Sequence, residues 1–600
     1  MKKIKSFFPN LLYSLKVTYK ASHIFFILKI ALTFISSFFP FVNIYIWRNI
    51  INFLTNIKNY DRINFLVTNI IAYMLFYLVT GFSGRVSQYV TYKYNDKVNI
   101  FLENIMIEKF AEVDLAFYDS SKLQDKLNRS WDIKYSMVSL GDTVFSLLQS
   151  SVTFITSLIL LAKLNIFYVF LILGLSLPVF ILKNNVNTIN NKFYDDNANT
   201  DRKIWYYKNL FINMNSSFDI RLFNLKDFFI GKYIKTWSEW YKRRKEVTVK
   251  STVLTLISLL ISSFTNQILL YILIIGKLVK RIIQIGDATY YISVFNQFYN
   301  STSGLVSNFS WMTNYAFRQV VTVKEFLDLE PLIQKNGTCE PKEFREITFS
   351  HVDFKYPGTD EYILKDCTFT IKRGQTIGLV GENGSGKSTI VKLLLRLYDI
   401  DDGQILLDGI DIKEYDIIKY RAIFSVLFQD FISYSFTLRE NVALSDYANI
   451  NDDKKINDAI NKSELRDIMK DWEKGLETPL TRYYDDDGKE LSGGQWQRVA
   501  LARVFFSNRN FIVLDEPSAS LDVFAEENIF RQFAQLSDNR SSFIISHRLS
   551  SIVNADVIIV LKDGRIVEQG SHNDLMKLNG YYSELFNLQA SRYLREEVKV

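Results

Sequence analysis

The stretch that decides the fold of this chain runs from residue 376 to residue 397 and reads TIGLVGENGSGKSTIVKLLLRL. Its centre, GENGSGKST from Gly381 to Thr389, fits the pattern G-x-x-x-x-G-K-[ST] of a phosphate-binding loop. The apolar residues 376–380 predict a strand before the loop, and residues 389–397 predict a helix after it. A strand, a glycine-rich loop and a helix in this order form the structural context in which the pattern binds nucleotides.

Each residue type in this loop has a chemical reason. Glycines let backbone N–H groups turn toward phosphate oxygens, and the N-terminus of the following helix favours an anion. We expect the Lys387 side chain to reach the β- and γ-phosphates of ATP and the Ser388 hydroxyl to bind Mg²⁺. The predicted nucleotide-binding residues of the loop are Gly381, Asn383, Gly384, Ser385, Gly386, Lys387, Ser388 and Thr389.

A second acidic motif lies downstream, where FIVLDE spans residues 511–516. An apolar run that ends in acids predicts a buried strand with carboxylates at its carboxyl end. On this reading Asp515 holds Mg²⁺ and Glu516 polarises the attacking water. Alone this pattern is weak, but the phosphate-binding loop upstream favours the functional interpretation.

Composition excludes several classes of protein. The 600 residues contain two cysteines, Cys339 and Cys367, and four histidines, so a disulfide framework and a zinc site are not expected. The formal charge of +7 is small for this length and gives no reason to expect a nucleic-acid partner. Hydrophobic residues make up 48% while 22% are charged, which indicates a membrane part joined to a soluble part.

The membrane part is predicted from long runs that lack charge. Five such runs cover residues 63–84, 143–162, 164–182, 251–276 and 288–317, and a sixth, 24–47, contains only Lys29. Each is near or above the roughly 20 residues that a helix needs to cross about 30 Å of hydrocarbon. Buried helices of a large soluble core would be the alternative, but six runs within the first half of the chain favour membrane helices.

Basic residues predict the orientation of these helices. Five lysines precede the first run, and the segment between the fourth and fifth runs is rich in arginine and lysine, so both belong on the cytoplasmic side. Lys163 lies in a very short connection that must be external, whereas the basic residues 277–281 on the same side are an exception to the rule. Two long cytoplasmic connections, 85–142 and 183–250, are expected to be helical and to reach roughly 40 Å from the membrane.

Further motifs carry a family resemblance. Leu491-Ser492-Gly493-Gly494-Gln495 matches the signature motif of ABC transporters. In family order the chain also has Tyr356 where an aromatic ring stacks on adenine, Gln429 of the Q-loop, Asp522 of the D-loop and His547 of the switch. The chain therefore resembles an ABC exporter half-transporter over nearly its whole length, and the resemblance implies that Gln429 also contacts Mg²⁺.

The resemblance implies a multidomain fold. An all-α transmembrane domain of six helices, with long cytoplasmic helical extensions, is followed by an α/β P-loop ABC ATPase domain. The transmembrane domain is expected at 1–330, a linker at 331–344 and the ATPase domain at 345–600. The six membrane helices are expected at about 23–47, 63–84, 143–163, 164–183, 251–277 and 286–317.

The family also implies a dimer, either of two copies or with a related half-transporter. Each ATP would lie between the phosphate loop of one subunit and the signature residues Ser492, Gly493, Gly494 and Gln495 of the other. Turns in the two long connections fall where the family places its coupling helices, and we expect coupling contacts from Tyr118, Asp119, Arg221 and Phe223. Glu516, His547 and Gln429 are the expected catalytic residues.

The substrate is the least determined point. Tyr291, Phe295, Phe298 and Tyr299 share one face of the predicted sixth helix, and an aromatic wall of this kind suits an amphipathic peptide or a lipid. Helix packing and anchoring at the membrane surface explain the same residues equally well. Details around the signature and the Q-loop resemble bacterial exporters of lantibiotics and related peptides, although Asp485-Asp486-Asp487 replaces the usual segment before the signature.

We therefore expect an ATPase that exports a peptide across a bacterial cytoplasmic membrane, with both termini and the nucleotide domain in the cytoplasm. A flippase for lipids or lipid-linked sugars, or a multidrug exporter, would use the same motifs with a different cavity. A soluble chromosome-maintenance ATPase shares the phosphate loop and the signature, but it separates them by coiled coils that are absent here. A channel gated by ATP without turnover is disfavoured by the intact Glu516.

Overall fold

The computed structural model describes residues 7–55, 63–119, 135–163, 166–261, 268–313, 317–335, 337–342, 344–516, 540–546 and 548–597. The chain forms two compact units. The first comprises Met1–Glu112 and Asp125–Leu329, and the second comprises Val113–Gln124 and Glu330–Val600. A short segment from the first long connection therefore belongs to the second unit.

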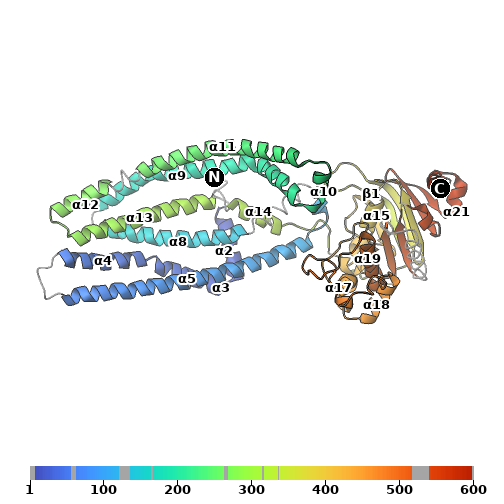
Figure 1. The fold of residues 1–600 in the computed structure, drawn as a ribbon, viewed down its shortest axis with the longest axis horizontal. Helices are drawn as coiled ribbons and strands as arrows, with labels where there is room; N and C mark the ends of the chain where they lie inside the picture. The colour runs from blue at the N-terminus through green and yellow to red at the C-terminus, as the bar shows by residue number, and fades with distance from the viewer. Residues whose placement is uncertain are drawn as a thin grey trace. The chain divides into compact units, whose positions relative to one another are not determined.

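The first unit is built from helices, and its longest members lie lengthwise alongside one another (Figure 1). The 50 residues of α5 span roughly 75 Å and the 47 residues of α9 roughly 70 Å, so each is more than twice as long as a bilayer core is thick. The helices are α2 Phe7–Ala21, α3 His23–Ser36, α4 Phe39–Thr55, α5 Ile63–Glu112, α8 Tyr135–Ala162, α9 Ile166–Ile212, α10 Met214–Leu222, α11 Lys226–Ile261, α12 Leu269–Val279, α13 Ile285–Trp311 and α14 Phe317–Leu327.

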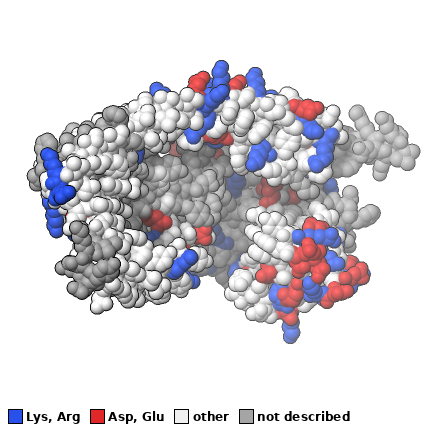
Figure 2. Space-filling view, turned by 60° about the vertical axis from the view of Figure 1, so that its left-hand side comes forward, with Lys and Arg blue, Asp and Glu red and all other residues white. Residues whose placement is uncertain are grey.

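Three stretches of helix among the described residues are long and apolar enough to cross a membrane, His23–Thr55, Ile63–Glu112 and Met137–Ala162. None of the most apolar window of Ile63–Glu112 is buried inside the chain. Its side chains Tyr77, Leu78 and Phe82 are 68%, 66% and 75% exposed. Exposing such a continuous apolar surface to water is unfavourable, so this surface is suited to contact with lipid. The face drawn in Figure 2 likewise has broad areas without charged side chains.

The first predicted membrane helix, 23–47, is interrupted in the structure. α3 ends at Ser36 and α4 begins at Phe39, with a turn at residues 37 and 38. Pro40 is the physical reason, because proline has no N–H to continue the helical ladder and is favoured in the first turn of a helix. The predicted fifth helix, 251–277, covers the end of α11 and most of α12, and residues 262–267 between them lie outside the described part of the chain.

The described strands of the second unit form two sheets (Figure 1). A four-stranded antiparallel sheet has the order β2-β1-β4-β5, and a six-stranded sheet has the order β10-β9-β3-β8-β7-β6. In the larger sheet β10 is antiparallel to β9, and the other neighbours are parallel. The strands are β1 Glu346–Phe354, β2 Leu364–Lys372, β3 Thr376–Gly381, β4 Asp402–Leu407, β5 Ile410–Asp411, β6 Phe424–Leu427, β7 Phe511–Asp515, β8 Ser541–Ile545, β9 Val557–Lys562 and β10 Arg565–Gly570.

The described helices of this unit pack on these sheets, and together they form two apolar cores. One core joins the two sheets and α15, and the other is centred on α17, α18 and α19. Every residue of β7 and of β8 is buried, which explains why their sequences are apolar without alternation. The α-helices are α6 Ala116–Asp119, α15 Lys387–Leu394, α16 Ile417–Arg421, α17 Leu438–Ala443, α18 Asp453–Lys462, α19 Gly493–Ser507, α21 His572–Leu578 and α22 Tyr581–Glu597.

Candidate functional site: the nucleotide edge of the sheet and its coupling contacts

The carboxyl ends of the parallel strands bring distant motifs together at one edge of the sheet. β3 ends at Gly381, where the phosphate loop begins, and β7 ends at Asp515 and is followed by Glu516. β8 lies between these two strands and pairs with both. Crevices at this edge of an open α/β sheet are where such folds bind ligands.

The backbone of the phosphate loop needs its glycines at two positions in particular. Gly386 has φ of 105°, and a Cβ atom there would lie 2.7 Å from the Leu364 side chain. Gly384 has φ of 81°, and a Cβ there would meet nothing within 4 Å. Both conformations are left-handed and unfavourable for other residues. Gly386 caps α15, so the loop delivers the chain directly to a helix N-terminus.

The Lys387 side chain lies inside this loop. It is 6% exposed, and its ammonium donates hydrogen bonds of 3.0 Å to the carbonyl oxygens of Gly381 and Glu382. Burial lowers the pKa of Lys387 below its usual value, while the carboxylates of Glu516 and Asp515 act in the opposite direction. The cation and the two acids of the distant motif are thus close enough to interact through their charges.

The described residues of the loop fit a triphosphate with Mg²⁺. The Ser385 hydroxyl oxygen is buried, and no described residue forms a hydrogen bond with it. A buried hydroxyl that lacks a hydrogen-bond partner is suited to donate to a phosphate oxygen. Ser388 is half-buried, Thr389 is buried, and Asn383 and Gly384 are exposed at the mouth of the loop.

The acidic end of β7 has unusual backbone geometry. Asp515 is 4% exposed, whereas Glu516 is half-buried. Glu516 has φ of 51°, and its N–H donates to the Ile545 carbonyl oxygen at 3.0 Å. A left-handed glutamate is strained, and strain of this kind concentrates where a side chain must point in a required direction.

The predicted Gln429 follows a strand that neighbours β7. Gln429 is exposed two residues beyond β6, whose last residue pairs with Leu514 of β7, so Gln429 follows a strand end beside that of Asp515. Ser546 follows β8 and is 3% exposed. The predicted His547 comes next, and both it and Asp522 lie outside the described residues.

The signature motif forms the N-terminus of α19. Ser492 is the N-cap residue; its hydroxyl accepts from the Gln495 N–H at 3.3 Å, and the Gln495 side chain accepts from the Ser492 N–H at 2.9 Å. Ser492 and Gly493 are exposed, and Gly494 and Gln495 are half-buried. This reciprocal cap holds the first turn rigidly while the helix N-terminus, which favours anions, faces outward.

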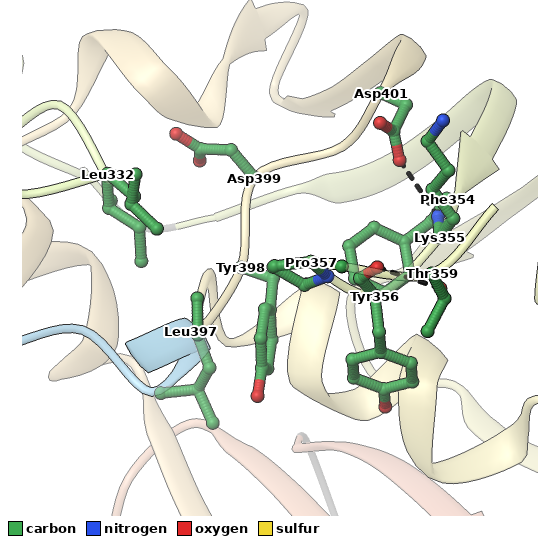
Figure 3. A pocket seen from close by; sticks show the side chains of 13 residues that line it. Leu332, Phe354, Lys355, Tyr356, Pro357, Thr359, Leu397, Tyr398, Asp399 and Asp401 are labelled. Atoms are coloured by element: carbon green, nitrogen blue, oxygen red, sulfur yellow. Dashed lines mark hydrogen bonds between the residues drawn. The ribbon is translucent and has the colours of Figure 1, made fainter. Parts of the chain in front are cut away.

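Tyr356 lies next to the phosphate loop. Its hydroxyl lies 3.1 Å from the Thr389 hydroxyl in the first turn of α15. Its ring packs edge-on against Phe354 and Tyr398, with ring centres 5.2 and 5.4 Å away. Figure 3 shows Tyr356 and Tyr398 side by side on the wall of a cavity of about 220 Å³.

Comparison with known proteins agrees with this geometry. Residues 364–519 match the family model described as ABC transporter. The chain therefore carries an ABC transporter domain joined to an N-terminal helical region, and it is homologous to ABC exporters. It is 28% identical to the subtilin transport ATP-binding protein SpaT of Bacillus subtilis, over 95% of this chain and 92% of that protein. It is 29% identical to the nisin transport ATP-binding protein NisT of Lactococcus lactis subsp. lactis, over 97% of both.

Other similarities cover less of the chain or are more distant. The ATP-dependent lipid A-core flippase of Escherichia coli strain K12 is 38% identical over 41% of each protein. A solved structure described as a bacterial Atm1-family ABC exporter with ATP bound superposes with a TM-score of 0.70. It covers 95% of this chain and 98% of the other at 20% identity. This ABC transporter therefore has the exporter fold, and it is an ATP-hydrolysing transporter that uses ATP with Mg²⁺.

A segment that the sequence assigned to coupling packs on the nucleotide part of this ABC transporter. Asp114 is 8% exposed, and one oxygen of its carboxylate accepts from the N–H groups of Leu332 and Ile333 at 2.6 and 3.0 Å. Asp119, at the end of α6, accepts a hydrogen bond from the Tyr398 hydroxyl. Burial and this carboxylate raise the pKa of Tyr398 above its usual value.

Two of these partners were not predicted from the sequence. Asp114 and Tyr398 carry no motif, and only the folded chain brings them to their partners. Ala116, Leu332 and Leu397 also line the cavity of Figure 3, so α6, the segment after Leu329 and the loop of Tyr356 surround it together. The predicted Tyr118 is 42% exposed, and the neighbouring Phe117 is 4% exposed.

The second predicted coupling segment is exposed in the first unit. It covers the last four residues of α10 and the following Phe223, and the Arg221 guanidinium donates to the Ser217 carbonyl oxygen at 3.1 Å. Phe218, Leu222 and Phe223 are 66%, 76% and 64% exposed. Large apolar side chains gathered at a turn mark a contact surface.

The four residues predicted to line a substrate cavity do not share one environment. Phe295 and Phe298 are 1% and 2% exposed, belong to an apolar cluster with residues of α4, α8 and α12, and Phe298 stacks on Phe154 at 5.1 Å. These two side chains serve helix packing in this conformation. Tyr291 and Tyr299 are half-buried and remain candidates for substrate contact.

Proposed function

We propose that this ABC transporter exports a peptide across a bacterial cytoplasmic membrane as a dimer of two copies. The observation that carries the proposal is the share of this chain that each relative matches. The subtilin and nisin transport proteins match at least 95% of this chain, whereas the lipid A-core flippase of Escherichia coli strain K12 matches 41%. The part of a transporter that differs between cargoes is the membrane part, so similarity over the full length is the better guide to cargo.

The phosphate loop is assigned to ATP binding. Its backbone amides and Lys387 would hold the phosphate oxygens. Tyr356, whose hydroxyl contacts that of Thr389, would stack on the adenine. Ser388, Gln429 and Asp515 are the proposed holders of Mg²⁺, and hydroxyl, amide and carboxylate oxygens are the ligands this ion prefers. Bound Mg²⁺ would supply positive charge that offsets the charge of the phosphates.

Glu516 is assigned as the group that polarises the attacking water. Its strained backbone supports the assignment, because the conformation fixes the carboxylate at the edge of the sheet rather than in the strand. Gln429 and His547 are assigned to the same step by their positions after β6 and β8. Asp522 is assigned to the contact between the two nucleotide sites.

Two copies are required on this proposal because the signature motif faces outward. Ser492, Gly493, Gly494 and Gln495 sit at an exposed helix N-terminus, which would offer its amides to the γ-phosphate held by the partner copy. ATP then binds the closed pair better than the open pair and shifts the population toward closure. The attachments of Asp114 and Asp119 would transmit this closure to the membrane helices, with Arg221 and Phe223 acting at the second coupling segment.

Transport into inside-out vesicles tests this function. Purified transporter is reconstituted in lipid, and uptake of a fluorescent amphipathic peptide is measured with ATP, without ATP, and with the Glu516→Gln variant. The proposal expects uptake that needs both ATP and Glu516. ATP-driven movement of a fluorescent lipid together with no peptide uptake would favour the flippase function, for which the similarity to lipid A-core flippases gives a specific reason.

A further inference from the structure

The charged residues within or directly beside the predicted membrane helices differ in whether they have a counter-charge. Lys29 of α3 lies 2.5 Å from a carboxylate oxygen of Asp142 in α8, and Arg48 of α4 lies 2.5 Å from one of Asp287 in α13. Lys183 of α9 is different, because no acidic partner for it exists among the described residues. Ionised groups in membrane helices are rare and are paired or functional, so the charge of Lys183 needs an explanation.

Lys183 belongs to a polar seam between α9 and α13. Its ammonium donates to the Ser303 hydroxyl at 2.6 Å and lies 5.9 Å from the ring centre of Tyr299. On the same faces the Asn187 amide donates to the Ser310 hydroxyl at 2.9 Å, and that hydroxyl lies 3.3 Å from the Asn184 side-chain oxygen. The asparagine and serine side chains form hydrogen bonds with one another, which helix packing explains. Helix packing does not explain the positive charge of Lys183.

Two helices give the same depth for this seam. Lys183 is 17 residues after the start of α9, or roughly 25 Å, and Ser303 is 16 residues after Asp287, or roughly 24 Å. On the predicted orientation both positions lie near the cytoplasmic end of a hydrocarbon core of about 30 Å, Lys183 at the last residue of the predicted helix 164–183 and Ser303 within 286–317. A lysine at this depth can extend toward the membrane surface, but this ammonium is directed across to α13 instead.

The seam is accessible to a ligand. Lys183, Tyr299 and Ser303 are each half-buried, in contrast to the fully packed Phe295 and Phe298 on the same helix. An ammonium has three N–H donors, and Ser303 accepts one of them. Polar side chains at membrane depth that are not fully packed face a water-filled path rather than lipid.

We propose that Lys183, supported by Tyr299 and Ser303, is a subsite that binds one carboxylate of the exported peptide. One compact cation beside a hydroxyl and an aromatic ring matches a single negative charge with an apolar neighbour. Phosphate recognition would favour the paired donors of an arginine fork. The inference rests on the proposed peptide export, and it identifies a part of the first unit that recognises the exported peptide.

The test compares two forms of one synthetic amphipathic peptide. The first has its C-terminal carboxylate as its only carboxylate, and the second carries a C-terminal amide. Stimulation of ATP hydrolysis is titrated with each form, using transporter reconstituted in neutral phosphatidylcholine. The wild type is compared with Lys183→Gln, with Ser303→Ala and with Lys192→Gln, which removes an exposed charge from the opposite face of α9.

The carboxylate form is expected to act at a concentration about tenfold lower than the amide form, as one charged hydrogen bond would provide. Lys192→Gln should keep both this preference and the basal hydrolysis, Ser303→Ala should reduce the preference, and Lys183→Gln should abolish it while the amide form still stimulates. A preference that survives in Lys183→Gln overturns the subsite while leaving peptide export intact. Stimulation by neither form contradicts both. Stimulation by phosphatidylglycerol alone that depends on Lys183 would assign the subsite to a lipid phosphate and overturn the proposal.

Discussion

Replacing Asp114 by alanine should uncouple substrate binding from ATP hydrolysis. One oxygen of the Asp114 carboxylate accepts two backbone hydrogen bonds, from Leu332 at 2.6 Å and from Ile333 at 3.0 Å. Both Asp114 and Ile333 are buried, at 8% and 4% exposure, so water cannot easily replace the lost acceptor. The variant removes the carboxylate and leaves the buried N–H of Ile333 and the part-buried N–H of Leu332 without their acceptor.

The size of the effect follows from these contacts. A hydrogen bond to a charged group contributes about 1.5 to 3 kcal/mol, and the lower value is appropriate for each bond beside a surface. Two such bonds give about 3 kcal/mol, which is roughly a hundredfold change in the equilibrium that holds residues 113–119 on the second unit. Asp114→Asn keeps an oxygen acceptor without the charge and should lose about half of this.

The assay is the ratio of peptide-stimulated to basal ATP hydrolysis in reconstituted transporter. Asp114→Ala should bring this ratio close to one while basal hydrolysis persists. The ratio for Asp114→Asn should lie between those of Asp114→Ala and the wild type. Limited proteolysis should cut the alanine variant faster near residue 119. Full peptide stimulation in Asp114→Ala would refute the assignment of this segment to coupling.

Three further predictions concern thiols, the phosphate loop and a membrane ion pair. Burial raises the pKa of Cys367 to about 11, so its thiol stays protonated, and a maleimide at about pH 8 should label the half-buried Cys339 but reach Cys367 only after unfolding, as mass spectrometry would show. Gly386→Ala should weaken ATP binding by about tenfold or more in equilibrium titration, because φ of 105° is unfavourable for alanine. Asp142→Asn should lower the thermal midpoint in detergent more than the double variant with Lys29→Met, because the single change leaves Lys29 buried and uncompensated.

Much of the nucleotide site follows from sequence because its chemistry is local. A loop such as 381–389 must carry glycines and a lysine in adjacent positions, and the strand before it must be apolar, so both signals lie in one short window. The adjacency of β3, β8 and β7 is not local, but parallel strands that end in functional residues meet at one edge, so the grouping of Asp515 with the loop could be anticipated.

The coupling role of Asp119 was predicted, but the partners of the contacts outside that edge could not be anticipated for a physical reason. Asp114 and Ile333 are far apart in the chain, as are Asp119 and Tyr398, and no residue type at these positions is special before folding. The aromatic face of α13 illustrates a different limit. Periodicity places Phe295 and Phe298 on one face with Tyr299, but it cannot say whether that face meets another helix or a cavity, and the structure packs both phenylalanines against neighbours.

The most direct test of the account is ATP hydrolysis by the purified chain alone in lipid, with and without an amphipathic peptide, for the wild type and Glu516→Gln. The account predicts turnover without any second protein, stimulation by the peptide, and a loss of at least about a hundredfold in Glu516→Gln while ATP binding persists. No turnover by the wild-type chain alone, or unchanged turnover in Glu516→Gln, would contradict the claim that two copies of this chain form a complete peptide exporter.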